Sequence, residues 1–131
     1  NTVEPMGEND SLELTKLSSR GITDQQPADQ AKEFLSHYDE ISGVRAVNHD
    51  GALMIAVKVK QLERFNLEDI EEALEQDIRK NFSKMKVKLS TDEKIYLELK
   101  RLEDDLLGQN ISYKEVKKRL KKIQQLSKEE T

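Results

Sequence analysis

The feature that most constrains the fold is a β-hairpin signal in the middle of the chain. Asp50 and Gly51 form a dipeptide that readily adopts the positive φ angles of a tight hairpin turn. Residues 44–49 before this turn alternate between two faces, and residues 52–60 after it alternate more clearly still. The sequence therefore predicts two antiparallel strands that meet at this turn.

Two helices and a third strand complete the predicted core. After Pro27 apolar residues recur at helical spacing and predict a first helix that ends near Gly43, which can adopt a left-handed cap. Asn66 is suited to cap a second helix, which we expect to run to about Asn81. Residues 84–89 then alternate as a third strand. A right-handed helical crossover predicts that this strand lies parallel to the second.

The two faces of the predicted sheet differ in character. Alternate residues of the second strand, from Leu53 to Val59, are aliphatic and form a core face that packs on the helices. The residues between them, which point to the opposite face, begin with Met54 and Ala56 and continue with lysines. We therefore expect this second face to be half solvated.

Two capping-box patterns after the sheet predict a C-terminal helical hairpin. Ser90 and Glu93 open one helix, and Ser112 and Glu115 open the next. A short break at residues 108–111 lets the two helices fold back as an antiparallel pair. The first helix is acidic and the second is basic, which favours this pairing. Whether the hairpin covers the second face of the sheet or projects away from it stays open from the sequence.

These elements define the predicted class as α+β. The fold is a small three-stranded sheet with helices on one face, in a helix-strand-strand-helix-strand core, plus the C-terminal helical hairpin. The core spans residues 27–90 and the hairpin residues 91–127. The polar residues 1–26 are typical of a flexible tether, and residues 128–131 form a tail.

Composition and spacing give no sign of an active site. The chain has no cysteine, so it holds neither disulfides nor thiolate metal sites. His37 and His49 lie in different predicted elements, and neighbouring carboxylates fall on polar helix faces. Neither a glycine-rich phosphate loop nor a nucleophile elbow is present in the sequence. We therefore expect no catalytic residues, no metal, no cofactor and no enzymatic activity.

The overall charge argues against a nucleic-acid partner. The net charge is −4 and the sequence pI is about 5.3, whereas phosphate binding depends on clustered cations. The basic run at residues 117–122 is best explained by pairing with the acidic helix before it. Contact with an anionic membrane is the second interpretation, and nucleic acid is the third.

Lysines on the predicted sheet are the candidate binding face. Five lysines of the second and third strands are expected to point to this second face. Four of them are the residues that we expect to bind a partner, namely Lys58, Lys60, Lys86 and Lys88, and Lys84 lies beside them. One interpretation is solubilisation, because lysines on edge strands block edge-to-edge pairing. The other is docking of an acidic protein, of anionic lipid headgroups, or of the acidic helix of the same chain.

Three motifs carry a family resemblance. They are a Gly-Val-x-x-Val entry to the hairpin at residues 43–47, the strand at residues 52–59, and the run Val-Lys-Leu-Ser-Thr-Asp at residues 87–92 with a helix behind it. In this order they resemble the YhcN/YlaJ family of sporulation lipoproteins of endospore-forming bacteria. The resemblance covers residues 26–107.

That resemblance implies an exported, lipid-anchored protein of the spore membrane with a role in spore formation or germination. The lipid would be carried by a cysteine upstream of Asn1, and the predicted tether would join it to the domain. We therefore expect a non-enzymatic module that binds a protein partner of the germination or cortex machinery. One alternative is a self-associating ring-building or scaffold domain of an envelope assembly, with identical chains as partners. A cell-wall hydrolase is the third, and a cleft of acidic side chains would support it.

Overall fold

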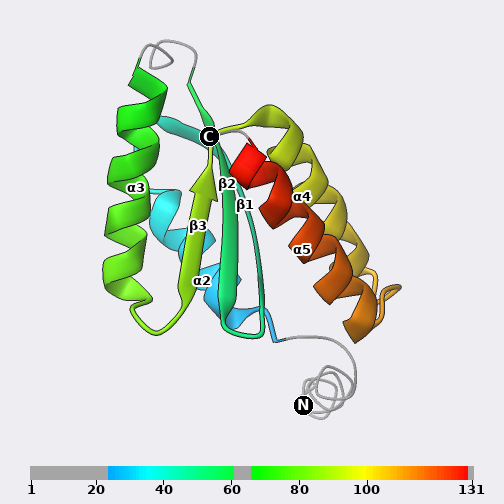
Figure 1. Ribbon diagram of the computed structural model, residues 1–131. Coiled ribbons are helices and arrows are strands. Elements are labelled where there is room, and N and C mark those ends of the chain that lie inside the picture. Colours follow the sequence, from blue (N-terminus) through cyan, green and yellow to red (C-terminus); the bar gives the residue numbers. More distant parts are fainter. Residues whose placement is uncertain (1–23, 61–65, 130–131) are drawn as a thin grey trace, which may run out of the picture.

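The computed structural model describes residues 24–60 and 66–129. Most of the predicted tether, and the last two residues of the predicted tail, lie outside these ranges. In chain order the elements are α2 (Gln26–Leu35), β1 (Ile41–His49), β2 (Ala52–Val59), α3 (Leu67–Asn81), β3 (Lys86–Ser90), α4 (Glu93–Leu107) and α5 (Tyr113–Glu129), as Figure 1 shows.

The sheet has the predicted topology, with strand order β1-β2-β3. β1 and β2 are antiparallel and join at Asp50 and Gly51, whose φ angles of 47° and 81° are those expected of the hairpin turn. β3 pairs with β2 in parallel, with Ala52 opposite Lys86. Both the hairpin and the parallel return of the third strand are therefore confirmed.

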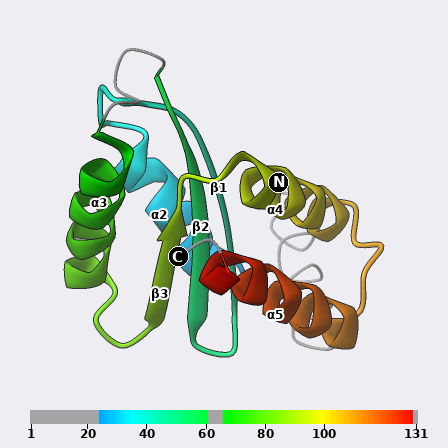
Figure 2. The ribbon, with the colours of Figure 1, turned by 45° about the horizontal axis from the view of Figure 1, so that its top comes forward.

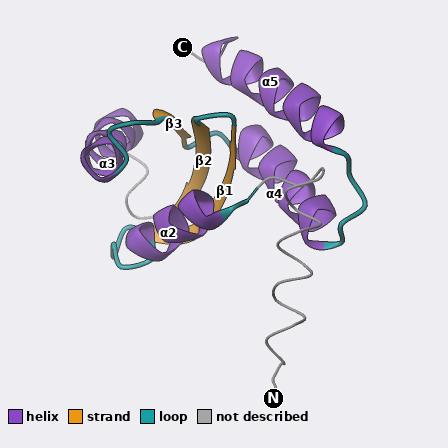
Figure 3. Cartoon of the chain, turned by 90° about the horizontal axis from the view of Figure 1, so that it is seen from below, coloured by secondary structure: helices purple, strands orange, loops and turns teal. Residues whose placement is uncertain are grey.

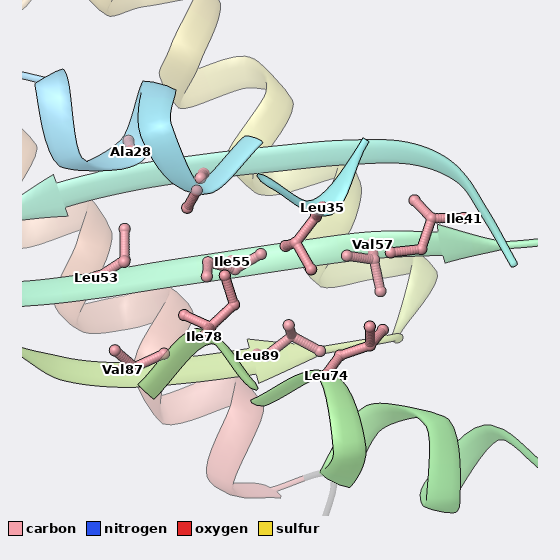
Figure 4. Close-up of a cluster of buried hydrophobic side chains, with 12 residues drawn as sticks. Ala28, Leu35, Ile41, Leu53, Ile55, Val57, Leu74, Ile78, Val87 and Leu89 are labelled. Carbon is pink, nitrogen blue, oxygen red and sulfur yellow. The ribbon is translucent and has the colours of Figure 1, made fainter. Parts of the chain in front are cut away.

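One hydrophobic core lies between the sheet and the helices α2 and α3, which share one face of the sheet (Figure 3). In Figure 4, Leu35 of α2 and Ile78 of α3 lie over Ile55 in the central strand. All three side chains are fully buried. The α+β class and the helix-strand-strand-helix-strand core are confirmed, because the helical and strand periodicities place these apolar residues on matching faces.

The helices α4 and α5 cover the opposite face of the sheet. Figure 1 and Figure 2 both show that they lie side by side and run antiparallel. Met54 and Ala56 are 0% exposed and pack with Leu99 and Val116 in a second core cluster. The expectation of a half-solvated face is therefore wrong at these two residues. The apolar faces of α4 and α5 pack on this side of the sheet and are removed from water there.

The first helix ends earlier than predicted. α2 stops at Leu35, and β1 already begins at Ile41, which pairs with Val59. Gly43 lies in this strand, next to a bulge, rather than at a helix end. An ideal Cβ on Gly43 would lie only 2.4 Å from Oη of Tyr96, so glycine is needed here for close approach. Strand pairing prevails over the local helical spacing that the sequence shows.

The caps of the C-terminal helices confirm one prediction and correct another. Ser112 Oγ accepts a hydrogen bond from the Glu115 N–H at 3.1 Å, as a capping residue does. α4 is capped by Asp92, whose Oδ2 accepts from the Ile95 N–H at 3.0 Å, and Ser90 instead ends β3. α5 extends to Glu129, beyond the predicted end of the hairpin.

None of the helices that the structure describes is both long and apolar enough to cross a membrane.

Candidate functional site: an acidic cleft

A cleft of about 770 Å³ lies between α3, the carboxyl end of β3 and the start of α4, with Ser127 of α5 at its border. Among the residues that the structure describes, six carboxylates and one lysine line it. The carboxylates are those of Glu68, Glu71, Glu72, Glu75, Asp92 and Glu93, and the cation is Lys88. The cleft therefore carries a strong excess of negative charge.

The acidic side of the cleft is one face of α3. Four glutamates at residues 68, 71, 72 and 75 follow the i, i+3, i+4, i+7 spacing that aligns side chains along a helix. Leu74 and Ile78 of the same helix are buried against the sheet, which directs the glutamate face away from the core. Negative charge near Leu67, where α3 begins, also suits the helix dipole. The amphipathic pattern of α3 thus produces both the core contact and the acidic side of the cleft.

Glu71 connects α3 to the segment between β3 and α4. Its Oε2 accepts a hydrogen bond from the backbone N–H of Thr91 at 3.0 Å. Burial raises the pKa of Glu71, while the Thr91 N–H and the charge of Lys88 act in the opposite direction without cancelling the effect. Its carboxyl group therefore holds a proton more readily than a fully solvated glutamate does.

The other acidic groups divide into engaged and open ones. Asp92 caps α4, and Glu75 forms an ion pair with Arg79 at 3.3 Å. Glu68 and Glu72 are exposed, and no ion pair joins either of them to another described residue. These two carboxylates are the part of the cleft that is available to a cationic group.

The four lysines predicted as a binding face do not share one open surface. Lys88 is half-buried and lines the cleft. Lys58 and Lys60 are exposed at the carboxyl end of β2, whereas Lys86 is exposed at the opposite end of the sheet, across from Ala52. Met54 and Ala56, the expected floor between them, lie beneath α4 and α5. A binding role for these lysines stays a prediction.

Lys58 and Arg45 lie against the ring of Tyr96, and this contact could not be predicted because the three residues lie on three different elements. The Lys58 Nζ lies 4.9 Å from the ring centroid and the Arg45 Cζ lies 5.6 Å from it. Arg45 Nε also donates a hydrogen bond to the Tyr96 oxygen at 3.3 Å. These contacts hold α4 against the β1–β2 hairpin.

Neither histidine belongs to the cleft. His37 is exposed, with Nε2 3.3 Å from Glu33 Oε2. His49 is buried beside the hairpin turn, and its ring centroid lies 4.5 Å from that of Tyr113. Within the described ranges, no group of three or more His, Cys, Asp or Glu side chains is arranged to hold a metal ion.

Sequence reasoning missed the cleft itself. The periodicity of α3 identifies its glutamates as a polar face, but a solvated face and one side of a cleft have the same pattern. The signal that was available is the concentration of six acidic residues before the first basic residue of α3, Arg79.

Comparisons with protein-family models, with curated proteins and with solved structures gave no match.

Proposed function

We propose that this chain is a non-enzymatic protein-interaction module whose acidic cleft receives a basic segment of a partner protein. The observation that carries the proposal is the α3 glutamate face, where Glu68 and Glu72 stand exposed beside the open cleft. Lysine or arginine side chains are the complementary groups, and charge complementarity of this kind gives specificity and fast association. Binding is expected to weaken as salt rises, because these charges are exposed.

We place this module in an exported, lipid-anchored protein of the spore membrane that acts in spore formation or germination. The support for this context is the resemblance of the hairpin and β3 motifs to the YhcN/YlaJ family. Deletion of the gene in the source organism tests it, with spore yield and germination rate as the measurements. Unchanged values for both would contradict this context and leave the binding property of the cleft to be judged by itself.

The binding property is tested with a short peptide of alternating Lys and Ser, compared with a matched peptide of Glu and Ser. Isothermal titration calorimetry is expected to show binding of the basic peptide alone. The double variant Glu68→Lys and Glu72→Lys is expected to weaken binding about tenfold or more. The matched control changes Glu33 and Asp39, which are exposed acids outside the cleft, to lysine. Equal loss in both variants would contradict a role of the cleft.

A cell-wall hydrolase is the second candidate, and the raised pKa of Glu71 is the observation that favours it. Glycoside hydrolysis uses a pair of carboxyl groups, and a raised pKa suits the one that acts as the acid. Glu71 shares the cleft with other carboxyl groups. However, no aromatic side chain is among the described residues that line it, and most ligand pockets are largely apolar. Release of soluble fragments from purified cell wall, lost in Glu71→Gln, would favour the hydrolase over the binding module.

A further inference from the structure

We propose that the outer face of α5 docks on an anionic membrane surface. Five lysines form this face, and we call them the lysine stripe: Lys114, Lys117, Lys118, Lys121 and Lys122. The stripe is separate from the residues that line the cleft. Its test is therefore independent of the proposed function.

The stripe is held outward by the packing of α5. Val116, Leu120 and Ile123 occupy the opposite side of the helix and are buried in the core cluster shared with α4. At 3.6 residues per turn, the five lysines fall within an arc of roughly 140° and along about 12 Å of the helix axis. A docked, rigid helix thus presents five ammonium groups in one direction.

These charges are not neutralised within the described part of the chain. Arg119 forms an ion pair with Asp105 of the acidic neighbour α4. All five lysines of the stripe are exposed, and none forms an ion pair with a described carboxylate. The charge pairing expected between the two helices therefore involves Arg119 and leaves the stripe available.

An anionic lipid surface suits this stripe better than a folded acidic protein. Specific protein interfaces are depleted in lysine and depend on buried aromatic or apolar anchors, and the stripe contains none. Headgroups of a fluid bilayer adapt to evenly spaced point charges without a fixed complementary shape.

Nucleic acid fits the charge distribution less well. The chain has a net charge of −4, and α3 carries six acidic residues on the other side of the sheet (Figure 3). The stripe also lacks the aromatic side chains and arginines that stack on bases or bind phosphates bidentately. A flat membrane contacts only the α5 side and avoids the acidic side of the molecule.

The experiment is vesicle sedimentation with the full chain. Vesicles of phosphatidylcholine alone are compared with vesicles that contain about 30% phosphatidylglycerol, at about 0.05 M and about 0.5 M salt. We expect binding to the anionic vesicles at low salt only. Because each lysine near an anionic surface strengthens binding about fivefold, the triple variant Lys117→Glu, Lys118→Glu and Lys121→Glu should reduce it by at least a hundredfold.

The matched control changes Lys80, Lys84 and Lys86 to glutamate, since these exposed lysines lie outside α5 and give the same change in net charge. Retained binding by this control supports the stripe, whereas loss of binding would overturn the proposal and indicate docking through α3 and the start of β3. A milder variant with glutamine at residues 117, 118 and 121 covers the event that charge reversal unfolds the protein. No binding of the wild type to anionic vesicles, or equally tight binding to polyglutamate or duplex DNA, would overturn the proposal.

Discussion

The carboxylate of Glu103 in α4 accepts a hydrogen bond from the backbone N–H of Ala46 in β1, with 2.7 Å between Oε2 and the nitrogen. β1 is an edge strand of the described sheet, so no further described strand is available to bond this N–H. Lys32 and Arg45 contribute ion pairs to the same carboxylate at 3.2 and 3.1 Å. A buried acid from the C-terminal hairpin therefore completes the hydrogen bonding of the sheet edge.

Removal of the Glu103 carboxylate is expected to destabilise the fold strongly. Glu103 is 7% exposed, and its loss leaves a buried N–H without its partner and removes one ion pair from each of Lys32 and Arg45. Glu103→Ala should lower the free energy of unfolding by about 3 kcal/mol, and Glu103→Gln, which keeps an acceptor, by less. Urea unfolding followed by circular dichroism measures both. A change below about 0.5 kcal/mol in the alanine variant would contradict a role in stability.

Gly43→Ala is expected to destabilise the protein through a clash with Tyr96. The added Cβ would lie 2.4 Å from the tyrosine oxygen and 3.3 Å from Cζ. We expect a loss of about 1–3 kcal/mol, as for overpacking elsewhere in protein cores. In a double-mutant cycle the loss should be smaller in the Tyr96→Phe background, which lacks the oxygen. Equal losses in both backgrounds would place the strain elsewhere.

The stability contributed by Glu71 is expected to depend on pH. Burial raises its pKa above the ordinary value of 4.5, so the unfolded chain loses this proton first as pH rises. Stability due to Glu71 therefore falls as pH rises from about 4.5 through the pKa of the folded state. Glu71→Gln does not titrate and should gain stability relative to the wild type above this window and not below it. Thermal melts at about pH 3.5 and about pH 7.5 test this, and a gain of equal size at both would contradict it.

The isolated chain is expected to be monomeric, because side chains occupy both edges of the sheet. Besides Glu103, the side chain of Gln25 bonds both the N–H and the C=O of Asn48 on β1, at 3.0 and 2.7 Å. On β3, Arg79 donates to the Val87 carbonyl at 3.3 Å. Such covered edges oppose strand-to-strand association. Sedimentation velocity should give a single species near 15.1 kDa, whereas a tight oligomer would favour the scaffold alternative.

The elements predicted correctly are those that local residues determine. The turn at Asp50 and Gly51 and the alternation of β2 depend on residues within a few positions of one another. The predicted end of the first helix was wrong because β1 begins at Ile41. From there it pairs with β2, which follows β1 in the chain. The burial of Met54 was missed because the residues that cover it, such as Leu99, lie in the helical hairpin. A single-sequence pattern does not contain such long-range packing.

The same reason limited prediction of the candidate site. The four lysines occupy alternate strand positions that belong to one face of the sheet. However, the parallel register places Lys86 across from Ala52, whereas Lys58 lies beyond the end of β3. Their grouping therefore needed the register and not only the alternation. Likewise, the α3 glutamates become part of a cleft only because the β3–α4 segment and Ser127 lie across from them.

An NMR titration of the isotope-labelled protein with the Lys-Ser peptide at low salt tests directly whether the acidic cleft binds a basic segment. We expect backbone amide signals of α3, from Glu68 to Glu75, and of Ser90 and Thr91 to shift in a saturable manner, and added salt to reverse these shifts. The Glu-Ser peptide should leave all of these signals in place. Shifts confined to other residues, or no saturable shifts with the basic peptide, would contradict the acidic cleft as a binding site.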